Sequence, residues 1–212
     1  MRLISFITIV WSILLGKPFF QETSIFQFQD KHVHASSIIE TSNSDLIVCW
    51  FYGSGERTAN DVLIQGSRLK KGAKTWGSLF EMTDTPGLPD CNPVLWIDKE
   101  NKLWLFWIAV RANRWENSML RYRTSTNYMK KGAPEWDWQD DIILKPGESF
   151  AEALQAGFDQ YVDEPMWAEY ALRYTKLIVE AAKDPEKRQK GWMTRIHPIS
   201  LNSGRILLPL YS

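Results

Sequence analysis

Apolar and polar positions follow one pattern twice along this chain. Residues 34–50 and 91–107 each consist of an apolar stretch, a polar turn and a second apolar stretch that ends in Trp. The two segments have equal length, align without a gap and lie 57 residues apart. Two apolar stretches around a short polar turn, here 41–45 and 98–102, are typical of β-hairpins. The sequence therefore predicts a repeated β-hairpin.

A second motif repeats downstream of each hairpin. Lys-Lys-Gly-Ala occurs at 70–73 and again at 130–133, and a Trp follows each time. A third hairpin pattern opens at His197, turns at 202–204 and continues as an apolar stretch to Tyr211. Each unit holds about four strands in roughly 60 residues, which is the size of a long β-propeller blade. A β-sandwich with chance similarity between its hairpins is the alternative.

The units predict an all-β fold, a partial β-propeller over residues 31–212. Buried inner strands explain the near-continuous apolar runs, and the repeated Trp suits a residue packed between blades. About three blades are present, and three cannot close a ring that takes about four to eight. The sequence ends at Ser212, directly after an apolar strand. We therefore expect the N-terminal part of a longer protein; a homo-oligomer that closes the ring is the alternative.

A helical pattern separates the second and third units, over about 148–190. Ser149 and Glu152 have the spacing of a capping box, which predicts a first helix over 148–161. The segment 163–165 marks a second helix start, with Pro in the first turn. An apolar stripe of about five turns follows, and we interpret it as packing against the propeller rather than as a cofactor site. Its members are Trp167, Tyr170, Ala171, Tyr174, Leu177, Ile178 and Ala181.

Residues 1–20 have the features of a signal peptide. Met1-Arg2 supplies positive charge, and residues 3–15 form an apolar run that is shorter than the ~20 residues of a membrane span. No Ala-x-Ala cleavage site follows, so an uncleaved anchor is an alternative, as is a buried first strand or helix. We expect a secreted or periplasmic protein that meets a membrane only if this segment is retained.

The charge balance argues against nucleic acid as a partner. The chain has 25 basic and 25 acidic side chains and a formal net charge of zero, whereas phosphate binding needs a clustered excess of Lys and Arg. Eleven Trp residues favour a β-rich protein. The two cysteines, Cys49 and Cys91, do not match a zinc site. In an exported protein they could form a disulfide, and two buried thiols are equally consistent with their strand-like context.

Several segments of the chain resemble the sialidase superfamily of six-bladed propellers with bacterial neuraminidase (BNR) repeats. The similarity is closest to its sialidase-like bacterial branch and rests on His-Ala-Ser-Ser-Ile at 34–38, Gly-Trp-Met-Thr-Arg-Ile-His-Pro at 191–198 and the run 203–212. It covers nearly everything after residue 30 and implies a six-bladed ring. The Asp-box of the family is degenerate at 67–76 and 125–136; because that box is a structural turn, its decay puts little of the implied chemistry in doubt.

The resemblance also implies roles for residues near the end of the first hairpin. Sialidases carry an Arg that binds the sugar carboxylate where His34 stands here, so one member of an Arg triad is missing. Arg57 and Asp61 resemble the family's Arg and acid/base, which implies Asp61 as a general acid with a raised pKa and Arg57 as a contact to an anionic group. A solvated turn is the alternative for 56–61. The nucleophilic Tyr, its partner Glu and the other arginines would lie beyond Ser212, so this chain alone is not expected to be active.

Further polar residues occupy equivalent blade edges, either beside a repeat start or after the second strand of a unit. Trp115 could supply an aromatic platform for a sugar beside them. The predicted substrate-binding set is His34, Arg57, Asn92, Arg111, Arg114, Arg195 and His197. His32 could pair with His34 on one side of a strand, but no third ligand is evident, so neither a metal nor a cofactor is expected.

Two classes of function remain open from the sequence. The first is an exported, sialidase-like glycoside hydrolase that acts on a terminal, acidic sugar of a glycan. The second is a propeller that binds a glycan without cleaving it, because a fold does not determine a function. A polysaccharide lyase of the same fold is a third possibility. In all three the expected partner is a glycan or oligosaccharide.

Overall fold

The computed structural model describes residues 19–212 and contains two four-stranded antiparallel sheets. Blade 1 comprises β1 (His32–Glu40), β2 (Leu46–Gly53), β3 (Leu63–Leu69) and β4 (Phe80–Thr83), and blade 2 comprises β5 (Asp90–Ile97), β6 (Leu103–Val110), β7 (Ser118–Ser125) and β8 (Trp138–Asp141). In both sheets the strand order follows the sequence. Such a four-stranded meander is the blade of a β-propeller, as the repeat predicted.

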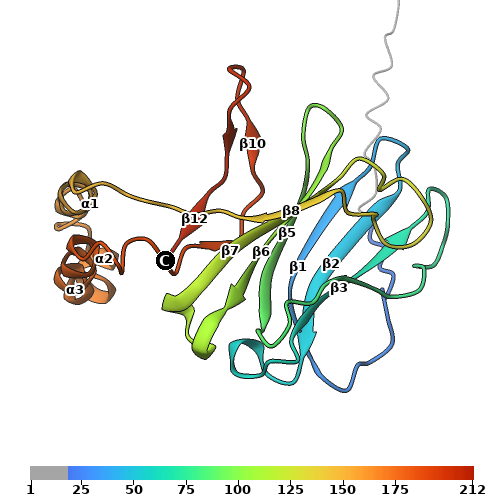
Figure 1. Ribbon diagram of the computed structural model, residues 1–212, viewed down its shortest axis with the longest axis horizontal. Coiled ribbons are helices and arrows are strands. Elements are labelled where there is room, and N and C mark those ends of the chain that lie inside the picture. Colours follow the sequence, from blue (N-terminus) through green and yellow to red (C-terminus); the bar gives the residue numbers. More distant parts are fainter. Residues whose placement is uncertain (1–18) are drawn as a thin grey trace, which may run out of the picture.

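The third unit is a hairpin built from four short strands. β9 (Met193–Thr194) pairs with β12 (Leu210–Tyr211), and β10 (Ile199–Ser200) pairs with β11 (Ile206–Leu207). The irregular residues 195–198 divide its first strand. Figure 1 shows that the turns of all three hairpins point the same way, toward the top of the view, while the β2–β3 and β6–β7 loops lie at the opposite end. The fold is therefore propeller-type and all-β, with two complete blades and the first hairpin of a third in the described residues.

The backbone repeats as closely as the sequence does. The pairing register of β1 with β2 shifts between His34 and Ser37, and that of β5 with β6 shifts between Cys91 and Val94. Six non-glycine residues with positive φ form three pairs that are 57 residues apart: Ala35 and Asn92, Ser44 and Asn101, and Glu56 and Asn113. Since left-handed backbone is uncommon outside glycine, this agreement confirms the offset. It also places a β-bulge at the start of each blade.

The core lies between the two blades. Trp107 is fully buried there, and the guanidinium carbons of Arg121 and Arg123 lie 5.5 and 5.6 Å from its ring centroid. Its counterpart Trp50 lies on the face of blade 1 that is turned away from blade 2, and Phe26 packs on it with ring centroids 4.8 Å apart. The Trp of the second hairpin is thus packed between blades, as predicted, and that of the first is covered by the preceding segment.

A buried arginine ties the blades together at the end where the hairpins turn. Arg68 of β3 donates to the carbonyl oxygen of Tyr128 at 2.5 Å and to that of Gly132 at 3.3 Å. Its guanidinium also lies 3.6 Å from the carboxylate of Asp45, which accepts from Lys70 at 2.6 Å. The two Lys-Lys-Gly-Ala turns are therefore linked, one through the Asp45 carboxylate and the other through the carbonyl of its glycine.

The insertion is helical, as predicted, and comprises α1 (Ser149–Asp159), α2 (Pro165–Tyr170) and α3 (Leu172–Lys183). Glu164 caps α2 by accepting from the Trp167 amide, with Pro165 at the first position. The predicted capping box is wrong, because α1 begins without a side-chain cap.

The interpretation of the apolar stripe is also wrong. The helices lie to one side of the blades in Figure 1, and α3 buries Thr175, Val179 and Ala182, with α1 as its main helical neighbour. The stripe members Tyr170, Tyr174, Leu177 and Ile178 are 44–67% exposed. α1 and α3 pack against each other through a face of α3 that lies next to the stripe. The single helix expected from the stripe is divided at Ala171 into α2 and α3.

The predicted signal segment falls almost entirely outside the described residues, which begin at residue 19. Over residues 19–212, none of the helices combines the length and the apolar character needed to cross a membrane. Cys49 and Cys91 are free and fully buried, and burial raises the pKa of both thiols. The structure thus supports the buried-thiol alternative.

Replacing Arg68 by Met should destabilise the protein by about 2–4 kcal/mol, because two carbonyls, one of them buried, lose their donor and a buried ion pair is broken. The measurement is the free energy of unfolding in urea. Lys70→Met is the matched control: it removes a cation from the same carboxylate, but the Lys70 side chain is 46% exposed, so we expect less than about 1 kcal/mol. Equal effects of the two substitutions would contradict the role given to Arg68.

Candidate functional site

The end of the blades opposite the hairpin turns collects the predicted site residues, and we call it the mouth (Figure 1). It consists of the starts of β1 and β5, the loops 54–61 and 111–117, and residues 195–198. The two loops contain short 3-10 helices at Glu56–Thr58, Arg111–Asn113 and Trp115–Asn117. All seven predicted substrate-binding residues, and Asp61, belong to these segments.

Direct contacts join the two mouth loops. The Asn113 side-chain amide donates to the Arg57 carbonyl at 2.6 Å and to Asn60 Oδ1 at 3.3 Å. The Arg57 guanidinium lies 5.3 Å from the ring centroid of Trp115. Trp115, which the sequence suggested as a sugar platform, is therefore partly covered by Arg57, and the two form one cationic and aromatic surface.

Backbone strain is concentrated at the mouth. Of seven non-glycine residues with positive φ in the described chain, five lie there: Ala35, Glu56, Asn92, Ala112 and Asn113. Such conformations cost of order 1–3 kcal/mol each and persist where the surroundings hold them, often at ligand sites. The clustering supports a functional role for this end.

Asp61 is held as an anion, which corrects the expectation of a raised pKa. Its carboxylate accepts from Lys31 Nζ at 2.8 Å, from Ser54 Oγ at 2.6 Å and from the Ser54 amide at 3.0 Å. The hydrogen bond from Lys31, followed by those from Ser54, lowers the pKa of Asp61 well below its ordinary value. The side chain is also 40% exposed. In this arrangement Asp61 anchors the loop and has no proton to donate near neutral pH.

A pocket of about 310 Å³ lies beside Asp61 in the first mouth loop. It is lined by His32, Glu56 and Arg57, together with the backbone turn from Ser54 to Thr58. Lys31 and Ser54 were not identified from the sequence, because nothing in their local pattern indicates that they meet a carboxylate. The one sequence feature that indicates Glu56 is its position in the repeat, where it is the counterpart of Asn113.

The two histidines at the start of β1 lie next to each other. The rings of His32 and His34 lie 5.8 Å apart between centroids, and His34 packs edge-on to Phe51 at 5.6 Å. Within the described residues, no group of three or more His, Cys, Asp or Glu side chains is placed to hold a metal ion. His34 is exposed and therefore free to meet a ligand.

The third hairpin contributes polar residues to the mouth through two side-chain contacts. Asn92, which is almost fully buried, donates to the Tyr211 hydroxyl at 2.9 Å. His197 Nε2 lies 3.2 Å from Ser37 Oγ, across from β1. Arg195 is exposed. Neither Tyr211 nor Ser37 was among the residues predicted from the sequence.

The arginines of the second mouth loop, Arg111 and Arg114, are more exposed than Arg57 in the first loop. Arg114 is the counterpart of Arg57 at the 57-residue offset and forms a 3.2 Å ion pair with Glu116, in which both side chains are largely exposed. Such a pair contributes little to stability. Arg111 is exposed at the loop start. Both guanidinium groups can therefore reorient toward a ligand at small cost.

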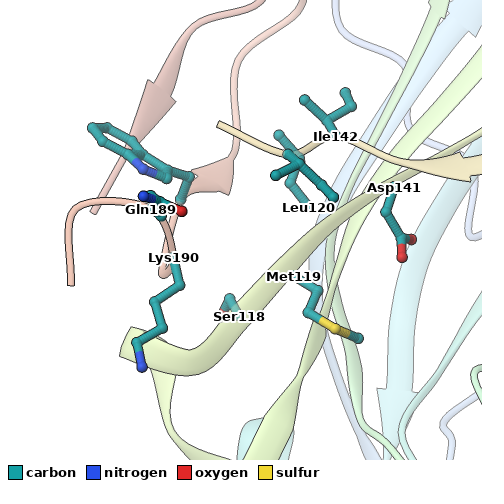
Figure 2. A pocket seen from close by; sticks show the side chains of 9 residues that line it. Ser118, Met119, Leu120, Asp141, Ile142, Gln189 and Lys190 are labelled. Atoms are coloured by element: carbon teal, nitrogen blue, oxygen red, sulfur yellow. The ribbon is translucent and has the colours of Figure 1, made fainter. Parts of the chain in front are cut away.

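Two of the other cavities are lined in part by Trp192. Figure 2 shows one of about 190 Å³ between β7, the residues after β8 and the segment 189–192; Leu120 and Ile142 lie side by side on one wall, with Gln189 across from them. The other, of about 550 Å³, is apolar and lies among α1, α3 and Trp192. Neither contains a predicted site residue.

The one carboxyl group whose pKa is clearly raised among the described residues is structural. Asp90 is fully buried; its two oxygens accept from Trp107 Nε1 at 2.9 Å and from the Thr85 amide at 2.7 Å. Burial raises its pKa to about 6. Because no surface of Asp90 is accessible, we assign it to the packing between the blades and not to the site.

Comparison with known proteins agrees with this architecture. The BNR repeat-like domain matches residues 44–156, which is more than half of the chain. The chain therefore belongs to the BNR repeat-like domain family, in the sialidase-type superfamily. No curated protein matches it.

Among solved structures, the chain is similar to a protein of unknown function from Dyadobacter fermentans, with a TM-score of 0.54, 13% identity, and coverage of 89% of this chain and 49% of that one. A family 117 glycoside hydrolase of the marine bacterium Zobellia galactanivorans gives a TM-score of 0.44, 10% identity, and coverage of 61% and 45%. The first similarity concerns the fold alone, and the second is too low to bear on fold or function. The chain spans about half the length of these structures.

Asp90 should make stability depend on pH. Its pKa is raised from 3.8 to about 6 in the folded state, so the folded protein holds this proton more tightly than the unfolded chain does. The resulting stability is present below about pH 4 and is lost as the pH rises to about 6. The free energy of unfolding of the wild type should therefore fall, relative to that of Asp90→Asn, across this window.

Urea unfolding of both proteins between about pH 4 and pH 7 measures this difference, and subtracting the two curves cancels the other carboxyl groups. Asp140→Asn, at an exposed position on β8, is the control and should keep the wild-type profile. A constant offset between wild type and Asp90→Asn would contradict the assignment.

Proposed function

We propose that this protein is an exported, sialidase-like glycoside hydrolase whose mouth binds a terminal, acidic sugar of a glycan. The observation that carries the proposal is the gathering of cationic and polar side chains from three repeated units at one end of the blades. Family membership in the sialidase-type superfamily supports a carbohydrate ligand. Export rests on the pattern of residues 1–20 alone.

The Arg57–Trp115 pair is the best-defined part of this site. A guanidinium group binds a carboxylate or sulfate through charge-assisted, often bidentate hydrogen bonds. The adjacent indole offers an apolar face to a sugar ring. The Asn113 side chain donates a hydrogen bond to the Arg57 carbonyl at 2.6 Å. This bond links the loop of Arg57 to the loop of Trp115, so each loop helps to hold the other in place.

A non-catalytic glycan-binding propeller is the second candidate, and a specific observation favours it. Asp61 carries a lowered pKa because Lys31 and Ser54 hydrogen-bond to it. Hydrolysis with Asp61 as the acid requires the bound sugar to displace Lys31 and to enclose the carboxyl group, which would raise its pKa. Binding alone requires neither change.

Arg57→Met should weaken the binding of an acidic oligosaccharide about 10- to 100-fold, since a charge-assisted contact contributes about 1.5–3 kcal/mol. The Met side chain keeps the apolar stem over Trp115. Isothermal titration calorimetry with sialylated, uronate-terminated and sulfated oligosaccharides measures the effect, and their neutral counterparts should bind weakly.

The matched control is Arg173→Met on α3, because Arg173 also stacks on an aromatic ring, Tyr174, at 4.7 Å. It should leave affinity unchanged. Equal binding of acidic and neutral sugars, or equal effects of the two substitutions, would contradict an anionic subsite at Arg57.

Turnover separates the candidate classes. If Asp61 is the acid, Asp61→Asn should abolish the release of reducing sugar and preserve affinity, and Glu40→Gln, at the exposed end of β1 beside the hairpin turn, should retain most of the activity. A binder shows no turnover in any variant. An unsaturated product that absorbs in the ultraviolet would instead indicate a lyase.

A further inference from the structure

The position of Ser37 in the repeat is unusual. Its counterpart in blade 2 is Val94, and its counterpart in the third hairpin is Ile199, so an apolar residue occupies this position in the other two units. Ser37 is nevertheless buried, with 7% exposure. A buried hydroxyl group at an apolar position lowers the stability of the folded protein unless it is hydrogen-bonded.

Ser37 makes two contacts that together determine in which direction its hydroxyl group donates and accepts hydrogen bonds. Its oxygen accepts a hydrogen bond from the Leu95 backbone amide at 2.9 Å, and the same oxygen lies 3.2 Å from His197 Nε2. The amide of Leu95 can only donate. The hydroxyl hydrogen therefore needs an acceptor, and within the described chain the one nitrogen or oxygen in hydrogen-bond contact that can accept it is His197 Nε2.

This requirement defines the tautomer of the imidazole. If Nε2 accepts from Ser37, it carries no hydrogen, and the hydrogen of the neutral ring is on Nδ1. In the opposite tautomer the serine oxygen would accept from both the Leu95 amide and His197 Nε2, and the hydroxyl hydrogen would have no acceptor among these residues. A neutral histidine in water favours the Nε2–H tautomer, so the site reverses the intrinsic preference.

We propose that Ser37 is a positioning residue that holds His197 in the Nδ1–H tautomer, so that this part of the mouth offers the ligand a hydrogen-bond donor. His197 is exposed, and among the described residues its Nδ1 has no hydrogen-bond partner. The ligand group at this point is then an oxygen acceptor, such as a ring, hydroxyl or carboxylate oxygen. That last step rests on the proposed function, whereas the tautomer does not.

The geometry also links the third hairpin to blade 1. His197 stands in the irregular segment that divides the first strand of that hairpin, at the position equivalent to Ala35 and Asn92 in the other bulges. The Ser37 hydroxyl lies between β1, the Leu95 amide of β5 and this histidine. The Ser37 side chain therefore connects all three units, and through this contact it sets the orientation of the His197 ring at the mouth.

The test is the tautomeric state of His197 in the 212-residue chain, measured by long-range ¹H–¹⁵N correlation spectra at about pH 8.5, where an ordinary histidine is neutral. The chain has three histidines, and His197→Gln assigns the resonance. We expect Nδ1–H as the main form of His197 in the wild type. A predominant Nε2–H form, or a mixture close to that of free histidine, would overturn the proposal without any variant.

Two substitutions test the role of Ser37 itself. Ser37→Ala should shift His197 toward Nε2–H, and Ser37→Thr should retain the wild-type spectrum, because threonine keeps the hydroxyl and has the shape of the Val94 counterpart. The resonances of His32 and His34 serve as internal controls that stay unchanged. An unaltered His197 spectrum in Ser37→Ala would remove Ser37 from this role.

Ligand binding provides a separate readout. If an oligosaccharide binds the wild type, Ser37→Ala should weaken it about 5- to 30-fold, the range expected for one hydrogen bond to a charged or neutral oxygen, and Ser37→Thr should restore the affinity. An Nδ1–H signal with no glycan binding would reject the proposed function and leave the tautomer assignment intact. Unchanged affinity in a folded Ser37→Ala would overturn the donor role toward the ligand.

Discussion

The packing of blade 1 against blade 2 is the interaction on which the rest of the structure depends. A single four-stranded sheet has a face that it cannot bury alone, and here the two sheets cover one another through an apolar layer around Trp107. Three polar side chains enter this region and make hydrogen bonds there: Arg68 to carbonyls of blade 2, Asp90 to an indole and an amide, and Ser37 to the Leu95 amide. These hydrogen bonds favour one relative placement of the blades, since sliding would break them.

That placement creates the mouth. Because each blade starts its first strand and turns between its second and third strands at the same end, equivalent residues of successive units come together there. Arg57 and Arg114 are such a pair, and so are Glu56 and Asn113, which share a left-handed backbone. The Asn113–Arg57 contact then joins the two loops directly. The site is thus a consequence of rotational repetition, and its chemistry is decided by the positions at which the units differ, such as Ser37 against Val94.

Two carboxylates of the mouth are held by donors: Asp61 by Lys31 and Ser54, and Glu116 by Arg114. In contrast, Arg111 and Arg195 are exposed and have no ion pair among the described residues. The net charge of the chain is zero, so the exposed arginines of the mouth reflect the arrangement of charges and not their overall number.

The sequence by itself determined the repeat, the hairpins with their turns, the helical character of the insertion and the end of the blades where polar residues gather. These features depend on local periodicity and on spacing along the chain, which are visible without coordinates. Only the tertiary structure decided that Lys31 reaches Asp61 and lowers its pKa, that α3 buries Val179 and not the stripe at Leu177, and that Ser37 meets His197. Each of these involves residues that are far apart in sequence or a choice between neighbouring helix faces. Their outcome depends on the relative placement of whole elements, which no local pattern records.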